Sequence, residues 1–342
     1  MTLTNLRLAN FRSYEEKEVE FHPRVTAIIG PNGSGKTNIV EALYVLGMTK
    51  GFRDNPAAMA RDESEWFRLE AQADKDSFAL SWKDGVKKIT KNENELSPHE
   101  YLGEFPVVLF EPSSLSLVKG SPSLRRQWLD RVLSFSDKAY LRALVQYRKG
   151  LKQRNALLRR ADASSDEIFA WDIILSEHAE VIATARKKML DDIEADFSES
   201  YSDISKSSDV TTIKYRSSIT VDGYREKLLM QLQNRLSMDR RMGGTSVGPH
   251  RDDIELIYNG KSLARYGSRG ENRTAVLALI MCELGYIQKR LNTPPILLLD
   301  DVLSELDEKR QKALLRGIEG VQTVLTSTDI QKDIGAHSTT KL

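Results

Sequence analysis

Cysteine is almost absent from the sequence, since Cys282 is the single one among 342 residues. A single cysteine excludes an intrachain disulfide and favours a reducing compartment. No apolar run reaches the roughly 18 residues that a membrane-spanning helix needs, and residues 1–11 lack the apolar core of a signal peptide. We therefore expect a soluble cytoplasmic protein with no membrane partner.

The net charge is also small, at +1. A chain this close to neutral gives no global reason to expect a polyanionic partner, so any nucleic-acid surface must come from charges segregated along the chain. Such segregation exists: residues 119–160 hold twelve Lys or Arg and two Asp, whereas acidic residues predominate from 162 to 203. The pattern predicts a helical hairpin with a basic and an acidic limb that pair in part. Ordinary solvated helix faces are the alternative interpretation.

The segment from Val25 to Tyr44 carries the clearest functional pattern. An apolar run, Val25–Ile29, is long enough for a buried strand, and residues 38–46 have apolar side chains at helical spacing. Between them, residues 30–37 read GPNGSGKT and fit the phosphate-binding template G-x-x-x-x-G-K-[ST]. Strand, glycine loop and helix occur in the order that a P-loop requires. The alternative is a glycine-rich turn that happens to end in Lys-Thr.

Each residue type in this loop has a physical role. Gly30, Gly33 and Gly35 permit backbone conformations and a close approach that a Cβ would obstruct, so N–H groups can converge on phosphate oxygens at a helix N-terminus. Lys36 supplies a point charge for the β- and γ-phosphates, and the Thr37 hydroxyl can ligate Mg²⁺. The predicted cofactor-binding residues are Gly30, Pro31, Asn32, Gly33, Ser34, Gly35, Lys36 and Thr37.

A second landmark is the run Ile296–Leu299, which leads into Asp300 and Asp301. Four apolar residues followed by an acid pair are typical of a buried parallel strand with a Mg²⁺ ligand at its C-terminal tip. Asp300 would hold Mg²⁺ directly or through water, and Asp301 would orient or deprotonate an attacking water. The alternative is a buried strand that ends in a solvated Asp-Asp turn.

The rest of the sequence contains regions with strand-like and regions with helix-like apolar spacing. Period-two alternation and short apolar runs predict strands at 66–71, 78–82, 86–89, 107–110, 254–258 and 323–326, and helical spacing predicts helices within 121–160 and at 224–236, 272–291 and 308–318. The P-loop and the acid pair lie about 260 residues apart, which is far more than a compact nucleotide-binding core needs. A large insertion between two halves of one lobe is therefore implied.

Five segments, taken together and in order, resemble the RecF family of bacterial recombination mediators over nearly the full length. They are GPNGSGKTN (30–38), VVLFEPSSLSLVKGSPSLRRQWLD (107–130), SVGPHRDD (246–253), YGSRGENRTAVLAL (266–279) and ILLLDDVLSELD (296–307). The resemblance implies an α/β fold, an ABC-type P-loop ATPase head like those of SMC and Rad50 proteins, with an inserted, mainly helical second lobe. We place the first half of the head at 1–118, the helical lobe at 119–236 and the second half of the head at 237–342.

The same resemblance implies an ATP-gated dimeric clamp that acts on gapped or stalled-replication DNA, with ATP and Mg²⁺ as cofactors and weak, DNA-stimulated ATP hydrolysis. The site is completed in trans: Ser268, Gly270 and Arg273 match the family's signature motif, and residues 304–307 match its dimer-interface D-loop. Ser268 and Gly270, near a predicted helix start, would offer a hydroxyl and a helix N-terminus to a γ-phosphate. With Lys36, Asp300 and Asp301 they form the predicted catalytic set, and Thr37 and Asp300 the predicted metal ligands. RecR, RecO and RecA are the implied partners, and recombinase loading and the SOS response the implied roles.

Two departures from the family pattern concern Ser113-Ser114, where the family commonly has an acidic pair, and Thr328-Asp329, where related ATPases carry a switch histidine. Slow turnover would be consistent with the second. A P-loop kinase of small molecules and a non-hydrolysing, nucleotide-switched scaffold remain alternatives. We expect DNA contacts from scattered basic residues, namely Arg125, Arg126, Arg131, Arg142, Arg148 and Lys149, with Lys50 and Arg53 near the P-loop helix.

Overall fold

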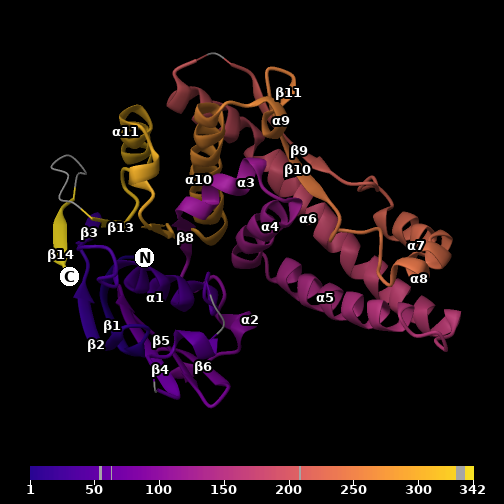
Figure 1. Ribbon diagram of the computed structural model, residues 1–342, viewed down its shortest axis with the longest axis horizontal. Helices are drawn as coiled ribbons and strands as arrows, with labels where there is room; N and C mark the ends of the chain where they lie inside the picture. Colours follow the sequence, from indigo (N-terminus) through magenta and orange to yellow (C-terminus); the bar gives the residue numbers. More distant parts are fainter. Residues whose placement is uncertain (54–55, 63, 208, 329–335) are drawn as a thin grey trace. The chain divides into compact units, whose positions relative to one another are not determined.

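The computed structural model describes residues 1–53, 56–62, 64–207, 209–328 and 336–342. These residues form two compact units. Unit 1 comprises Met1–Ser116, Ser200–Ser207 and Arg269–Leu342, and unit 2 comprises Leu117–Glu199 and Ser208–Ser268. Elements of both units are labelled in Figure 1.

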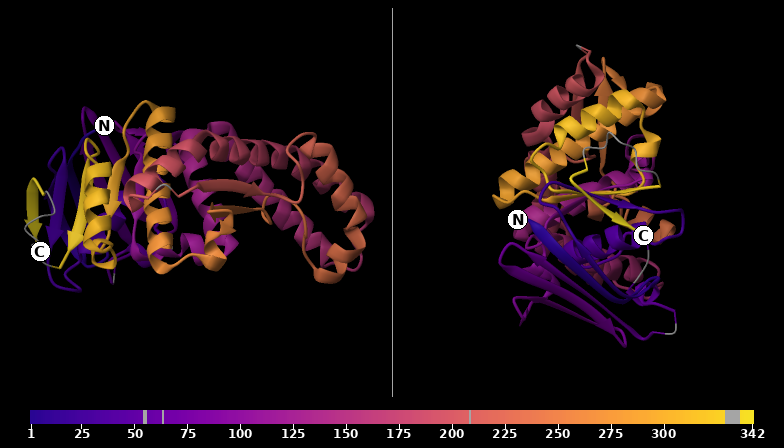
Figure 2. Two further views of the ribbon diagram at one scale, coloured as in Figure 1. Left: turned by 90° about the horizontal axis from the view of Figure 1, so that it is seen from above. Right: turned by 90° about the vertical axis from the view of Figure 1, so that its left-hand side faces the viewer.

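Unit 1 is built on a parallel sheet with the strand order β14-β3-β13-β12-β8. Its strands are β3 (Val25–Ile29), β8 (Val107–Phe110), β12 (Ile296–Leu299), β13 (Thr323–Ser327) and β14 (Ser338–Lys341). The runs in β8 and β12 are buried at every position, as expected for strands that are covered on both faces. In Figures 1 and 2, β3 (indigo) and β14 (yellow) lie side by side, although they come from opposite ends of the chain.

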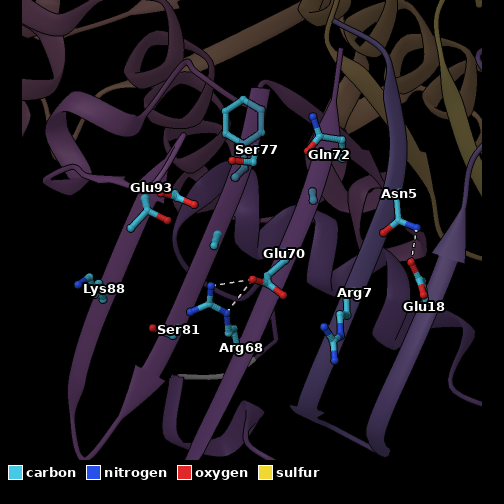
Figure 3. A pocket seen from close by; sticks show the side chains of 14 residues that line it. Asn5, Arg7, Glu18, Arg68, Glu70, Gln72, Ser77, Ser81, Lys88 and Glu93 are labelled. Atoms are coloured by element: carbon cyan, nitrogen blue, oxygen red, sulfur yellow. Dashed lines mark hydrogen bonds and ion pairs between the residues drawn. The ribbon is translucent and has the colours of Figure 1, made fainter. Parts of the chain in front are cut away.

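A second, antiparallel sheet in unit 1 has the order β2-β1-β4-β5-β6-β7. Its strands are β1 (Leu3–Phe11), β2 (Tyr14–Glu20), β4 (Trp66–Ala73), β5 (Asp76–Lys83), β6 (Val86–Lys91) and β7 (Asn94–Glu95). Alternate residues such as Leu6, Leu8 and Leu69 are buried, whereas the opposite face is polar (Figure 3). On that face Asn5 donates to Glu18 and Arg68 donates to Glu70.

The helix α1 (Lys36–Met48) contacts strands of both sheets, which explains why nearly all of its residues are buried. The helices α10 (Arg269–Leu291) and α11 (Glu308–Gly317) lie on the other side of the parallel sheet (Figure 1). The buried side chain of Gln322 links the two sheets, because it accepts from Leu3 N and donates to Leu3 O, both at 2.7 Å. Shorter elements are η1 (Pro56–Met59), α2 (Pro98–Tyr101), η2 (Pro112–Leu115) and η3 (Leu303–Glu305).

Unit 2 is mainly helical. After α3 (Ser116–Lys119) come α4 (Pro122–Ser136), α5 (Lys138–Leu158) and the long helix α6 (Ser165–Ser205), whose last residues belong to unit 1. The Asp137 side chain caps α5 by accepting from the backbone N–H groups of Ala139 and Tyr140. The remaining elements are β9 (Thr211–Arg216), α7 (Tyr224–Asn234), α8 (Leu236–Met242), β10 (Asp253–Tyr258), β11 (Lys261–Ser262) and α9 (Leu263–Tyr266). The predicted hairpin is formed by α5 and α6 (Figure 1).

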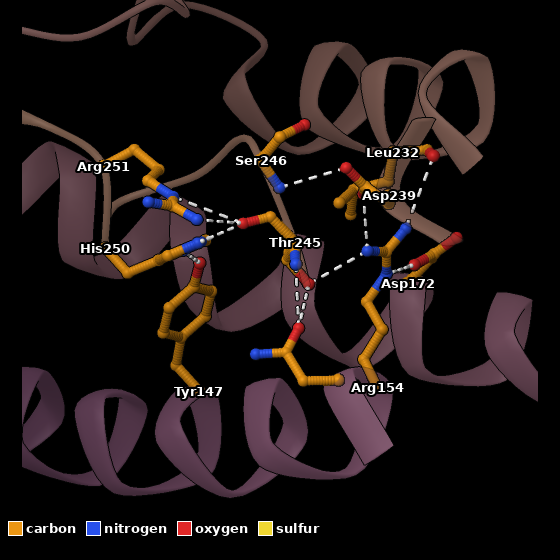
Figure 4. A network of polar contacts seen from close by, with 10 residues as sticks. Tyr147, Arg154, Asp172, Leu232, Asp239, Thr245, Ser246, His250 and Arg251 are labelled. Carbon is orange, nitrogen blue, oxygen red and sulfur yellow. Dashed lines mark hydrogen bonds and ion pairs between the residues drawn. The ribbon is translucent and has the colours of Figure 1, made fainter. Parts of the chain in front are cut away.

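The expected return to the head at residue 237 is wrong, because residues 237–268 cluster with unit 2. Two features hold them there. The predicted strand at 254–258 forms as β10, but it pairs with β9 and β11 in a separate small sheet and not with the sheets of unit 1. In addition, Arg154 on α5 donates to Asp239 Oδ2 at 2.7 Å and to Thr245 Oγ1 at 2.9 Å (Figure 4).

Candidate nucleotide site

The loop between β3 and α1 has the backbone that the glycine pattern predicts. Gly33 and Gly35 have φ values of 84° and 98°, in the left-handed region that favours glycine. A Cβ added to Gly35 would lie 2.5 Å from Tyr14 Oη, and one added to Gly30 would lie 2.6 Å from Ser34 Oγ. Side chains at these two positions would therefore clash with Tyr14 and Ser34 unless those groups moved.

Lys36, the first residue of α1, is buried, with 7% of its surface exposed. Its Nζ donates to the carbonyl oxygens of Gly30 and Pro31 at 2.7 and 2.9 Å, so the ammonium group is held over the loop. An ammonium group has three N–H donors. The third remains for an acceptor outside the loop.

The hydroxyl groups of Thr37 and Thr326 and the carboxylate of Asp300 meet near the C-terminal ends of β12 and β13. Asp300, which follows β12, accepts from Thr37 Oγ1 and from Thr326 Oγ1, each at 3.0 Å. Burial raises the pKa of the Asp300 carboxyl, and the two hydroxyl donors oppose that rise. The structure thus brings Thr37 and Asp300 together, as expected for two ligands of one metal ion.

Asp301 differs from its neighbour, because its side chain is exposed and its φ is 49°. Its backbone N–H donates to Thr326 Oγ1 at 2.8 Å. Thr326 therefore positions both members of the acid pair. The sequence motifs do not point to Thr326; the available signal is a polar residue near the end of a predicted buried strand.

A buried carboxylate in α1 was also missed. Glu41 is fully buried and accepts from Arg12 Nε and Nη2, both at 2.9 Å, and from Arg53 Nη2 at 2.5 Å. Arg53 also donates to Asn38 Oδ1 at 3.1 Å. The contacts hold the Arg53 cation beside the first turns of α1, where its charge lowers the pKa of Asp300 against the larger effect of burial. An acidic residue among apolar neighbours in a predicted buried helix was the signal.

These residues fit a magnesium–nucleotide complex. The loop has no room for side chains at Gly30 and Gly35, and Ser34 Oγ is buried with no hydrogen-bond partner in the described part of the chain. Hydroxyl and carboxylate oxygens are the ligands that Mg²⁺ prefers, with water and phosphate oxygens completing its shell. The protein ligands would be Thr37 and Asp300, whose side-chain oxygens lie 3.0 Å apart. Within the described residues there is no cluster of three or more His, Cys, Asp or Glu that could hold a metal.

The signature segment opens α10, which begins at Arg269, three residues before the predicted start. Gly270 O accepts from Arg310 Nη2 at 2.7 Å, and Arg310 also donates to Thr274 and Asp307. Arg273 donates to Glu305 Oε2 at 3.2 Å. The signature segment is thus tied to residues 304–307 by two arginines. Ser268, the last residue of unit 2, is exposed.

Of the two departures from the family pattern, Ser113-Ser114 has a local structural role. Ser114 Oγ accepts from Glu111 N at 3.2 Å and so helps to cap the turn η2, and Ser113 Oγ donates to the Glu111 carboxylate at 2.6 Å. Thr328 follows β13 and is exposed. Asp329 lies outside the described residues.

The basic limb is less uniform than its charge count indicates. The expectation that Arg125 contacts DNA is wrong. This residue is 8% exposed and binds both carboxylate oxygens of Asp253 at 2.7 and 2.9 Å. Across the hairpin, Arg154 pairs with Asp172 and Arg186 with Asp130, so the limbs do pair in part. The exposed cations of α5 are Lys138, Arg142, Arg148, Lys149 and Lys152.

None of the helices in the described ranges is long and apolar enough to span a bilayer.

Comparison with known proteins agrees with this architecture. Residues 2–329 match the family described as RecF/RecN/SMC N terminal domain. The chain is 35% identical to the DNA replication and repair protein RecF of Clostridium perfringens, over 97% of this chain and 94% of that protein. It is 36% identical to the same protein of Geobacillus thermodenitrificans, over 96% and 93%.

Solved structures give the same result. A structure of the recombination mediator protein RecF with ATP, from the RecFOR pathway, superposes with a TM-score of 0.92 at 33% identity and covers 99% of this chain and 95% of that one. An SMC head bound to the C-winged helix domain of ScpA has a TM-score of 0.52 at 18% identity, covers 96% and 90%, and shares the fold alone. The predicted α/β class, an ABC-type ATPase head with an inserted helical lobe, is confirmed, and the chain belongs to the RecF family.

Proposed function

We propose that this chain is an ATP-dependent DNA-binding protein of DNA repair and replication, and that it hydrolyses ATP slowly. The observation that carries the proposal is the contact between Thr37 and Asp300 at the end of a glycine loop that holds the Lys36 ammonium group. Residues about 260 positions apart meet where a nucleotide's phosphates and Mg²⁺ would need them. The curated relatives are named for DNA replication and repair, and a close structural relative holds ATP.

In this proposal, phosphate binding, metal binding and activation of water are carried out by different residues of the site. The backbone N–H groups of residues 30–37 and the Lys36 ammonium bind the β- and γ-phosphates, and Thr37 and Asp300 hold Mg²⁺. When bound, Mg²⁺ supplies neutralisation of the charge that develops on the phosphates. Asp301, exposed beside the buried Asp300, orients or deprotonates the attacking water. Thr326 fixes the positions of both acids through its hydroxyl group.

We further propose that ATP closes a homodimer, in which the signature segment of one subunit meets the nucleotide of the other. Ser268 is exposed, and within the described residues Gly270 and Arg273 contact residues 305–310 of their own chain. An ATP-gated clamp of this kind would act on gapped or stalled-replication DNA. RecR, RecO and RecA are the proposed partners, with recombinase loading and the SOS response as its roles.

DNA binding would come from phosphate contacts along α5. Arg142 and Lys149 are exposed, and no described carboxylate lies within ion-pair distance of either one. A protein that neutralises about five phosphates should show log K falling against log salt with a slope near −4 to −5 on duplex DNA. Reversal of Arg142 and Lys149 to Glu should flatten the slope by about one to two units and leave ATP binding unchanged.

Sedimentation velocity with and without ATP and a gapped duplex tests the clamp. ATP should convert monomers to dimers, and Ser268→Arg should block that conversion while the monomer still binds ATP. Ser165→Arg, which adds the same charge at an exposed serine of α6, is the matched control and should dimerise normally. A normal ATP-induced dimer for Ser268→Arg would refute the site in trans. ATP binding without any turnover would favour the scaffold, and phosphate transfer to a small molecule would favour a kinase.

A further inference from the structure

Unit 2 contains a pocket of about 190 Å³, and all of its lining residues belong to that unit. It lies among α4, α5, α6 and the loop before β10, and its charged lining consists of Arg126, Asp130, Arg148 and Arg186. Ser123 and Gln127 add polar groups at the α4 side. Three cations and one carboxylate therefore face one small space.

The single carboxylate is shared. Arg186 is buried and donates to Asp130 Oδ1 at 2.7 Å, to Pro249 O at 2.7 Å and to Tyr140 Oη at 3.1 Å. Arg148 donates to the other carboxylate oxygen, Asp130 Oδ2, also at 2.7 Å. Asp130 Oδ1 also accepts from Tyr140 Oη, so this carboxylate is shared by Arg186, Arg148 and Tyr140, and Arg126 is not among its hydrogen-bond partners.

Arg126 is the third arginine. In the described part of the chain its side chain has one hydrogen-bond partner, the carbonyl oxygen of Asp252 at 2.8 Å, and no carboxylate within ion-pair distance. The nearby carboxylates are engaged elsewhere, since Asp252 binds Tyr215 and Asp253 binds Arg125. Burial, with Arg186 close by, lowers the pKa of Arg126. An anion in the pocket would relieve both effects.

His250 closes one side of the pocket without adding charge. Its Nε2 contacts Thr245 O at 3.0 Å, and because a carbonyl only accepts, Nε2 carries the proton (Figure 4). Its Nδ1, 2.6 Å from Tyr147 Oη, then accepts from that hydroxyl. Burial lowers the pKa of His250 to about 4, so the ring is neutral at physiological pH. The positive charge of the pocket therefore comes from its arginines.

We propose that this pocket binds one phosphoryl group, either the terminal phosphate of a DNA strand or a free phosphate ion. Arginine donors in a half-buried setting are suited to phosphate oxygens. The volume exceeds the roughly 30 Å³ of one water several times, but falls below the 300 Å³ or more that whole small-molecule ligands occupy. A strand-terminal phosphate projects beyond the last nucleotide and carries close to two negative charges, so it can enter a recess that an internal phosphodiester on a duplex surface cannot.

The DNA form of this inference rests on the DNA binding proposed above. Fluorescence anisotropy at fixed salt would compare one labelled duplex with a 5′-phosphate or a 5′-hydroxyl at its unlabelled end. Wild-type protein should prefer the phosphorylated end about tenfold. Arg126→Gln should reduce the preference to less than twofold, and Arg126→Lys, which keeps the charge, should retain part of it. Arg142→Gln, on the exposed face of α5, is the matched control and should weaken binding to both duplexes equally.

A second arm tests free phosphate in the Lys36→Met background, in which the P-loop contributes no phosphate site. Millimolar inorganic phosphate should raise the melting temperature relative to chloride at equal ionic strength, and the additional change Arg126→Gln should remove that rise. A phosphate-specific rise without end discrimination would assign the pocket to free phosphate. If neither duplex bound at all, the proposed DNA binding would be refuted. The melting temperatures would still show whether the pocket binds phosphate. Neither end discrimination nor a phosphate-specific rise would overturn the inference.

Discussion

Arg154 gives the most demanding test of the structure of unit 2. Its side chain is fully buried and donates to Asp172 at 2.5 Å, to Asp239 at 2.7 Å, to Thr245 and to a backbone carbonyl (Figure 4). Arg154→Met would leave two buried carboxylates without their cation. Removal of one partner from a buried ion pair costs about 3–5 kcal/mol, because the other charge stays desolvated. We expect at least that loss in the free energy of unfolding of unit 2 at pH 7.5.

The loss should depend on pH. Burial already raises the pKa of Asp172 against the opposing charge of Arg154, so removing Arg154 raises it further. A carboxyl whose pKa is higher in the folded state binds its proton more tightly there. Its contribution is favourable below the unfolded pKa of about 3.9 and is lost as pH rises through the folded value. The deficit of Arg154→Met relative to wild type should therefore be larger at pH 7.5 than at pH 5.5.

Urea unfolding would be followed by fluorescence in a background where Trp66 and Trp82 of unit 1 are replaced by Phe, so that Trp128 and Trp171 report on unit 2. Lys152→Met, at an exposed position of the same helix, is the control and should change stability by less than about 0.5 kcal/mol. Adding Asp172→Asn and Asp239→Asn to Arg154→Met should recover part of the loss. A loss below 1 kcal/mol, or one that is equal at both pH values, would refute the reasoning.

Three further predictions concern the nucleotide site. Lys36→Met should abolish tight ATP binding because the ammonium group held over the loop is lost, and undiminished affinity in an equilibrium-binding assay would show that the P-loop assignment is wrong. Asp301→Asn should keep ATP affinity but slow hydrolysis roughly a hundredfold or more and trap the dimer; unchanged steady-state turnover would remove Asp301 from catalysis. Gly35→Ala should weaken ATP binding, because the new Cβ would meet Tyr14 Oη and the φ of this residue disfavours a side chain. Gly85→Ala is the control, since Gly85 also has a positive φ but no atom near its Cβ. It should lower stability without changing the ATP dissociation constant.

The local motifs were predictable because the residues that form each of them are consecutive in the sequence. The glycine loop needs a strand before it and a helix after it, and the acid pair needs a buried strand, so short segments were enough to find Lys36, Thr37 and Asp300. Thr326 could not be found in this way. Its role depends on β13 lying between β3 and β12, a neighbour relationship that no local pattern contains.

Charge patterns predicted less than motif patterns. A count of basic residues does not distinguish Arg125, which is buried and forms an ion pair with Asp253, from Arg142, which is exposed. Similarly, the strand pattern of β10 was visible in the sequence, but the sheet it joins was not. The second unit boundary was misplaced for that reason, since a strand period of two is the same in either sheet.

The position of β3 has a consequence for how the protein is made. This strand precedes the P-loop, yet its two neighbours are β13 and β14, which lie within residues 323–341. On the ribosome, both edges of β3 must therefore stay without their native partners while roughly 300 further residues are added, which takes about 15–60 s at 5–20 residues per second. Exposed strand edges of this kind are what chaperones protect. A chain that stops short of β13 would lack the strand that supports both Asp300 and the P-loop, so nucleotide binding would report that synthesis has reached the final strands.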